Sequence, residues 1–198
     1  MGRKPTLSRD DWIDAAADWI AEHGVGALAV EPLARALGVT KGAFYWHFAS
    51  RDALLTAVLE RWEAEGTEAV IRLVDAMPDS AQHAVQLIRL VTRTVTDEGP
   101  TPTRAVRLQY ALWCAAADPL VAPAVERVTA ARVRYLAQVL AQAGLAPPVA
   151  ADRAKLGYAS YVGMVVLQAT RGQGGGAGLN APALVDVYLT MLLTPPPA

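Results

Sequence analysis

Both phenylalanines of the chain lie in one segment, LGVTKGAFYWHF, which covers residues 37–48. Phe44 and Phe48 are four residues apart, so a helix places both rings on the same face. Tyr45, Trp46 and His47 lie between them and must point elsewhere, partly into solvent. The segment therefore predicts a short helix that is anchored by two rings and that exposes aromatic and basic groups.

The elements around this segment follow the order helix, tight turn, helix. We expect a helix over Val30–Leu37, a turn at Gly38–Val39 and a second helix over Lys41–Phe48, capped by Thr40. Ala34 is small where two helices would cross closely, and glycine in the turn can take a positive φ. This is the helix-turn-helix pattern, whose second helix enters the major groove of DNA.

The residues on the outer face of the second helix have the chemistry that such a placement needs. Lysine, arginine, threonine and tyrosine side chains and helix N-termini contact phosphates, while base edges set the sequence. Gly42 lets the backbone approach closely, and the Ala43 methyl can touch a thymine methyl. Arg3 and Lys4 lie on an N-terminal arm that could reach the backbone or the minor groove. The predicted DNA contacts are Arg3, Lys4, Thr40, Lys41, Gly42, Ala43, Tyr45, Trp46, His47 and Arg51.

The region from Trp12 to Leu55, above all GVTKGAFYWHFASRDALL, resembles the N-terminal DNA-binding domain of the TetR (tetracycline repressor) family. The resemblance implies that Thr40, Lys41, Ala43, Tyr45 and His47 face the groove. It also implies that Arg51 makes the phosphate contact usually made by a lysine. The chain departs from the family at Ala29, where threonine or serine is common, so a helix cap and one phosphate hydrogen bond are missing there.

The remaining sequence predicts an all-α protein, because no run shows sustained two-residue alternation. Ser8 and Asp11 form a capping-box pattern at the first helix, and Ser50 can cap a long fourth helix. Further helices fit roughly 80–97, 103–117, 119–143, 148–171 and 182–193. We expect an N-terminal three-helix DNA-binding domain over residues 1–50. A C-terminal helical bundle for ligand binding and dimerisation should cover residues 51–198.

Composition narrows the classes of protein that remain. With 53% apolar residues and 19% charged residues, a sizeable core is available. The net charge of −1 means that any nucleic-acid site is a local patch. One cysteine, Cys114, excludes an intrachain disulfide and the common zinc spacings. We see no secretory signal and no stretch long enough to span a bilayer, and we expect a cytoplasmic protein.

Several other patterns favour a structural explanation over a chemical one. Asp10, Asp14 and Asp18 repeat every four residues, which predicts a solvated acidic face, not a metal site. The glycine-rich run 171–178 lacks the context of a phosphate loop and fits a linker. The three histidines share no ligand spacing, and nothing nominates a catalytic set. We therefore expect no metal, no cofactor and no enzymatic activity.

The bundle carries two further predicted surfaces. Mostly apolar walls with a few polar groups describe a small-molecule pocket, although they equally describe ordinary helix packing. The predicted pocket residues are Tyr110, Trp113, Cys114, Tyr158 and Tyr161. The last two helices have apolar residues around more than one face, which predicts a homodimer interface. The predicted interface residues are Leu156, Ala159, Val162, Gly163, Val166, Leu184, Val187, Tyr188 and Met191.

Together these features indicate a homodimeric transcriptional regulator of TetR type. We expect a repressor that binds a palindromic operator in double-stranded DNA and is released by a small, largely apolar ligand. One alternative is a helical enzyme or ligand carrier with a vestigial DNA-binding module. A second alternative is a DNA-binding module that has no effector.

Overall fold

The computed structural model describes residues 7–96, 102–170 and 182–194. Within these ranges the chain forms α-helices and no strand, which confirms the all-α prediction. Arg3, Lys4 and the glycine-rich run 171–178 lie outside the described residues. The helices are α1 Arg9–His23, α2 Val30–Ala36, α3 Lys41–Tyr45, α4 Arg51–Glu63, α5 Ala69–Asp75, α6 His83–Thr96, α7 Arg104–Cys114, α8 Val121–Gln142, α9 Pro147–Ala169 and α10 Pro182–Leu193.

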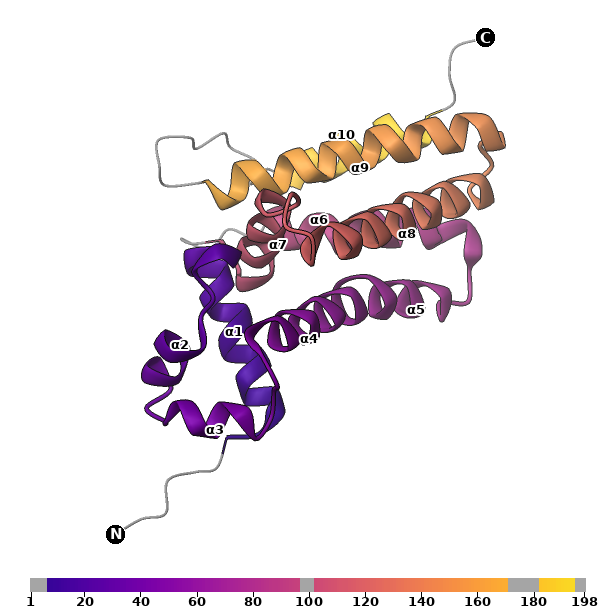
Figure 1. Ribbon diagram of the computed structural model, residues 1–198. Coiled ribbons are helices and arrows are strands. Elements are labelled where there is room, and N and C mark those ends of the chain that lie inside the picture. The colour runs from indigo at the N-terminus through magenta and orange to yellow at the C-terminus, as the bar shows by residue number, and fades with distance from the viewer. Residues whose placement is uncertain (1–6, 97–101, 171–181, 195–198) are drawn as a thin grey trace.

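Figure 1 shows how these helices are layered. Helices α1, α2 and α3 gather at one end of the molecule, and α4 leads from them into the bundle. Helices α4 and α5 form one side of the bundle, α8 runs through its middle, and α9 and α10 form the opposite side. The short helix α3 therefore lies at the far end of the molecule from α9 and α10.

Helix α1 begins with the predicted capping box. The Ser8 hydroxyl accepts the Asp11 backbone N–H at 3.1 Å, and the Asp11 carboxylate accepts the Ser8 N–H at 2.7 Å. Because the Ser8 backbone and hydroxyl both donate to this carboxylate, the pKa of Asp11 lies below its ordinary value. These bonds satisfy N–H groups that the first helical turn would otherwise leave without an acceptor.

The N-terminal helices enclose the aromatic core that the sequence predicts. Phe44 and Phe48 are both buried, and their rings stack with centroids 5.7 Å apart. Trp12, which the sequence analysis did not assign to the core, meets Phe44 edge-on at 5.3 Å. Ala34 is buried where α2 passes the other helices, as expected. The two phenylalanine rings thus hold α3 against α1.

Two details of the helix-turn-helix differ from the prediction. Helix α3 ends at Tyr45, three residues before Phe48, and the Phe44 carbonyl there accepts from the N–H groups of both His47 and Phe48. The Thr40 side chain makes no capping hydrogen bond, so the predicted cap of α3 is wrong. The predicted turn is confirmed at Gly38, whose φ is +67°.

The buried core does not stop at residue 50. The cluster around Trp12 and Phe44 continues through α4 to Trp62 and reaches Leu112 of α7 and Val128 of α8. A second cluster fills the rest of the bundle between α5, α6, α8, α9 and α10. Helix α4 runs as long as expected, but it passes into a π-helical turn over Ala64–Glu68 before α5 begins. The helix-turn-helix is therefore packed directly against the bundle.

Replacing Phe44 with alanine should lower the free energy of unfolding by about 3–5 kcal/mol, because a fully buried ring is lost. The matched control is Tyr45→Ala, which removes the adjacent but exposed ring and should change stability by about 0.5 kcal/mol or less. Urea unfolding of both variants measures the difference. Equal losses of stability in the two variants would contradict the anchoring role of Phe44.

Candidate nucleic-acid interface and ligand cavity

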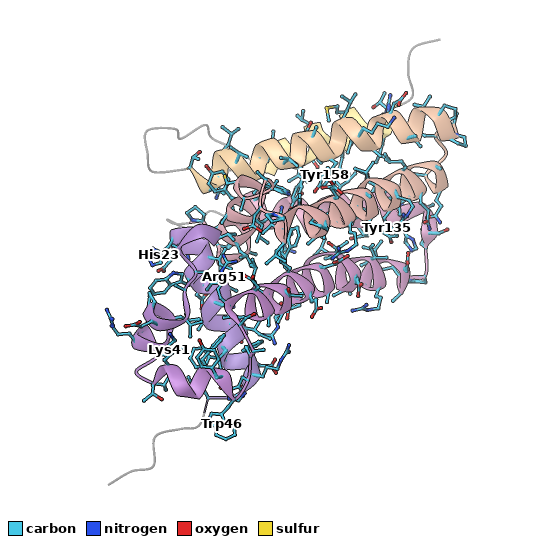
Figure 2. The ribbon with its side chains drawn as sticks, viewed as in Figure 1. His23, Lys41, Trp46, Arg51, Tyr135 and Tyr158 are labelled. Atoms are coloured by element: carbon cyan, nitrogen blue, oxygen red, sulfur yellow. The ribbon has the colours of Figure 1, made fainter. Side chains whose placement is uncertain are left out.

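The outer face of α3 and the turn after it are open to solvent. Lys41, Gly42 and Tyr45 are exposed, and 89% of the Trp46 surface is accessible. Figure 2 shows Trp46 pointing away from the protein at the outer end of the helix-turn-helix. Thr40 is exposed as well, while Ala43 and His47 are half-buried. Seven of the predicted contacts thus lie on one short segment with an aromatic and basic surface.

Arg51 is placed differently from the other predicted contacts. Its Nη2 donates to the Val25 carbonyl at 2.9 Å and its Nε donates to the Leu28 carbonyl at 3.3 Å. Its Nη1 is 3.0 Å from the Asp52 carboxylate. The guanidinium therefore ties the start of α4 to the connection between α1 and α2. In this structure it serves the packing of the helix-turn-helix, and the phosphate contact stays a prediction.

The acidic face of α1 is exposed, as predicted, and its aspartates also pair with two arginines of the bundle. Arg61 of α4 pairs with Asp10 and lies 3.3 Å from the Asp14 carboxylate. Arg104 of α7 lies 3.1 Å from the Asp14 carboxylate and 2.7 Å from that of Asp18. Its guanidinium also donates to the Asp14 carbonyl at 2.9 Å. We call these five residues the α1 ion-pair ladder, and it joins the helix-turn-helix to two bundle helices.

A cavity of about 500 Å³ lies directly behind this ladder. This volume is within the usual range for a small-molecule site. Its walls come from α1, from each of the helices α4 to α9 and from the π-helical turn, and they are mostly apolar. Asp14, Arg61 and Arg104 of the ladder line it, so an occupant would touch the groups that hold α1. A smaller cavity of about 70 Å³ adjoins it through Gly66, Val70, Arg132 and Tyr161, which line both.

The polar centre shared by the two cavities is Arg132 of α8. Its Nε donates to the Thr67 hydroxyl at 2.9 Å and its Nη2 donates to the Gly66 carbonyl at 3.1 Å. Both acceptors belong to the π-helical turn, a distortion that often occurs at functional sites. Its Nη1 donates to the Gln109 amide oxygen at 2.9 Å, and the Gln109 amide donates to the Tyr161 hydroxyl at 3.1 Å. The sequence analysis missed Arg132. The one local signal for this site was Gly66, a glycine within a helical stretch, whose carbonyl accepts from Arg132.

The predicted pocket residues divide into two groups. Tyr161 lines both cavities and Tyr158 lines the smaller one, where Figure 2 shows it between α9 and α8. Tyr110, Trp113 and Cys114 line neither of these cavities. A hydrogen bond with Cys114 instead raises the pKa of Tyr110 above its ordinary value. Tyr110 and Trp113 pack against the second core cluster, which agrees with the alternative that these residues serve ordinary helix packing.

Most predicted dimer residues lie on open surface of α9 and α10. Leu156 is 67% exposed and Val187 is 62% exposed, and Ala159, Val166 and Met191 are also exposed. Val162, Gly163 and Leu184 are half-buried. Tyr188 differs, because it is buried within the protomer, where its hydroxyl donates to the Gly157 carbonyl. Its burial raises its pKa, and its role is to pack α10 onto α9.

Two further searches cover the described residues only. No group of three or more histidine, cysteine, aspartate or glutamate side chains within residues 7–96, 102–170 and 182–194 is arranged to hold a metal ion. No helix in these ranges is both long and apolar enough to cross a membrane.

Replacing Arg51 with alanine should lower the free energy of unfolding by about 1–3 kcal/mol, since two backbone carbonyls lose a charged donor. Lys41→Ala is the matched control on the same domain, and it should change stability by about 0.5 kcal/mol or less. Urea unfolding without DNA measures both variants. A fully stable Arg51→Ala variant would mean that these contacts contribute nothing to the fold.

Comparison with known sequences places the helix-turn-helix in one family. The family described as "Bacterial regulatory proteins, tetR family" matches residues 13–58. The class A tetracycline repressor from transposon 1721 of Escherichia coli is 45% identical over 64 residues, which are 32% of this chain and 30% of that protein. The AcrR transcriptional regulator of Shigella flexneri is 29% identical over 93 residues, which are 46% of this chain and 43% of that protein. The matches thus span less than half the length of these two relatives.

Solved structures resemble the chain over nearly its whole length. A transcriptional regulator from Rhodococcus sp. Rha1 has a TM-score of 0.74 at 23% identity and covers 94% of this chain and 96% of its own. A TetR transcriptional regulator from Legionella pneumophila has a TM-score of 0.70 at 17% identity, covering 96% of this chain and 98% of its own. A regulator from Saccharomonospora viridis, solved in complex with choline, also has a TM-score of 0.70, at 17% identity, covering 93% of this chain and 92% of its own. Residues 13–58 thus carry the DNA-binding sequence of the tetR family of bacterial regulatory proteins, and the chain as a whole has the fold of these solved regulators.

Proposed function

We propose that the chain is a homodimeric repressor that binds a palindromic operator and is released when a small molecule fills the cavity behind α1. The observation that carries this proposal is the exposed face of α3. Lys41, Tyr45 and Trp46 project from a helix whose opposite side is fixed by two buried rings. Trp46 is 89% exposed and lies on one short segment with Lys41 and Tyr45, whose side-chain types contact phosphates in protein–DNA complexes.

The geometry supports a contact in which α3 lies in the major groove. Helix α3 begins at Lys41, so the lysine side chain and the N-terminal amides of the helix lie together. Both are groups that contact phosphates when a helix enters the major groove. Gly42 is exposed, and a Cβ there would meet only the Thr40 hydroxyl, at 3.7 Å, so the backbone is open to close approach. The half-buried Ala43 presents at most a methyl group to a base edge.

The exposed apolar surface supports a dimer through α9 and α10. Among the described residues, nine large apolar side chains are exposed, and five of them belong to these two helices: Leu156, Val166, Leu167, Val187 and Met191. Several exposed apolar side chains on two neighbouring helices favour an interaction site there. A Cβ on Gly163 would meet nothing within 4 Å, which leaves room for a partner helix. A two-fold pair would present two α3 helices to two half-sites.

The α1 ion-pair ladder supports a route from the cavity to α3. Arg61 and Arg104 line the cavity and pair with Asp14 of α1, which lines it too. Helix α1 also carries Trp12, which packs on Phe44. An occupant that separates these groups would shift α1, and α3 would move with it. The ligand then acts by preferring the arrangement in which the two recognition helices no longer match the half-sites. The choline complex of the Saccharomonospora viridis regulator is consistent with a small organic effector for this fold.

Selection of binding sites from random double-stranded DNA with the full chain tests the proposal. The selected sequences should be palindromic, with half-sites centred about 34–36 Å apart or a near multiple of that distance. This outcome would also exclude the vestigial-module alternative. Failure to enrich any sequence, or enrichment of sites without two-fold symmetry, would contradict the proposal.

Lys41→Ala should weaken binding to operator and unrelated DNA alike, and it should reduce the salt slope of binding by about 1. The physical reason is that one phosphate loses its cation. Lys155→Ala, on α9, is the control and should leave the slope unchanged. Fluorescence anisotropy at several salt concentrations gives the slopes. Identical slopes for Lys41→Ala and the parent chain would show that this face does not meet the DNA backbone.

Val187→Asp should yield a folded monomer with weak operator binding, because it places a charge in the proposed interface. Leu73→Asp is the control, since Leu73 is an exposed leucine on α5, away from α9 and α10. Sedimentation velocity distinguishes monomer from dimer. If Val187→Asp sediments as a dimer like the control, the interface lies elsewhere.

A further inference from the structure

Arg132 is a cation without a carboxylate partner among the described residues. Three arginines and two acidic residues line the larger cavity: Asp14, Arg61, Glu65, Arg104 and Arg132. Asp14 is paired with both Arg61 and Arg104, and Glu65 lies 3.9 Å from Arg61. Both acids are thus engaged on the side of the cavity that faces α1. The positive charge of Arg132 is not balanced by the lining.

The hydrogen bonds of Arg132 leave it able to bind an anion. Its three acceptors within the described ranges, Thr67, Gly66 and Gln109, are all neutral. They use one N–H on each guanidinium nitrogen, so Nη1 and Nη2 each keep a second N–H. These remaining N–H groups can donate to the oxygens of a carboxylate, and charge-assisted bonds of this kind are the strong ones.

Gln109 orients a further donor toward the same space. Its amide oxygen must face the Arg132 guanidinium, which has no acceptor to offer, so its amide nitrogen faces Tyr161. The Tyr161 oxygen therefore accepts from Gln109, and its own hydroxyl proton points elsewhere. Tyr161 lines both cavities, as Arg132 does. The buried Gln109 thus holds a guanidinium and a phenol as neighbouring donors.

Apart from its charged and polar residues, the wall of the cavity is apolar. Trp62 lies beside Arg132, with the guanidinium carbon 5.5 Å from the ring centre, and Val70, Leu90 and Val106 line the larger space. Burying an anion in such a place costs free energy unless a cation and hydrogen bonds compensate, and Arg132 and Tyr161 supply both. The same walls favour a hydrocarbon or aromatic body.

We infer that the cavity binds an organic anion, a carboxylic acid with an apolar body, whose carboxylate pairs with Arg132 and accepts from Tyr161. This inference rests on the proposed role of the cavity as the effector site and narrows the effector from an apolar molecule to an amphipathic acid. Arg132 is then the residue that selects acids over neutral molecules of the same shape.

Calorimetric titration of the full chain with two matched pairs of probes tests the inference. The pairs are decanoate with 1-decanol, and 1-naphthoate with 1-naphthamide, which differ in charge but little in shape. In the parent chain at least one acid should bind about tenfold more tightly than its neutral partner. Arg132→Gln should reduce that ratio to about twofold or less, and Arg132→Lys, which keeps the charge, should retain part of it.

Arg127→Gln is the matched control, because Arg127 is on the same helix, pairs with Glu63 and lines neither cavity. It should keep the full preference for the acid. The inference is overturned if neither acid binds the parent chain, if neutral partners bind as tightly as acids, or if Arg132→Gln keeps the preference. If Arg132→Gln does not fold, the comparison within the parent chain still tests whether the cavity prefers acids, and Arg132→Lys tests the part played by Arg132.

Operator release is measured separately, by anisotropy with the same probes. Acids that bind through Arg132 but leave operator affinity unchanged would support the anion site and contradict the proposed effector role. Release of the operator by the neutral partners alone would support that role and overturn the anion site. The two ideas can therefore fail independently.

Discussion

Helix α1 is the element on which the rest of the structure depends, because it packs both within the helix-turn-helix and against the helices of the bundle. One side of it supplies Trp12, against which Phe44 packs, and another supplies the aspartates that bind Arg61 and Arg104. Exposed ion pairs are individually weak, commonly worth about 0–1 kcal/mol. Here they act with a core that runs without interruption from the helix-turn-helix into α7 and α8. This continuity is the basis of our proposal that a movement of the bundle is passed to α3 through α1.

Helix α3 shows why this support is needed. Lys41–Tyr45 is too short to be stable by itself, since an isolated helix in water needs about 12–15 residues. It lacks a side-chain cap, and it is held by the buried rings of Phe44, within it, and Phe48, three residues beyond its end. The position of α3 is therefore set by the neighbouring residues that these rings pack against, Trp12 of α1 among them. A recognition helix that depends on its neighbours is well suited to regulation, because a small shift beneath it changes where it points.

Local patterns could be read from the sequence, and contacts between distant residues could not. The capping box at Ser8, the positive φ of Gly38 and the burial of Phe44 follow from residue types a few positions apart. The pairing of Arg104 with Asp18 joins residues far apart in the chain, and nothing in either segment announces it. Arg132 was missed, and Tyr188 was expected at the dimer interface although it is buried against α9. The reason is the same in both cases, because the sequence of an amphipathic helix does not reveal which neighbour covers each face.

The central claim is that filling the cavity moves the two recognition helices relative to one another. Pulsed electron-spin distance measurement tests it most directly, with Cys114→Ser removing the native thiol and Arg35→Cys placing one label on the exposed side of α2. The distance between the two labels of the dimer should shift when whichever of decanoate and 1-naphthoate binds more tightly is added to saturation. In an Asp14→Asn, Asp18→Asn background, which weakens the α1 ion-pair ladder, the shift should be smaller. An unchanged distance distribution with the cavity filled would contradict the account.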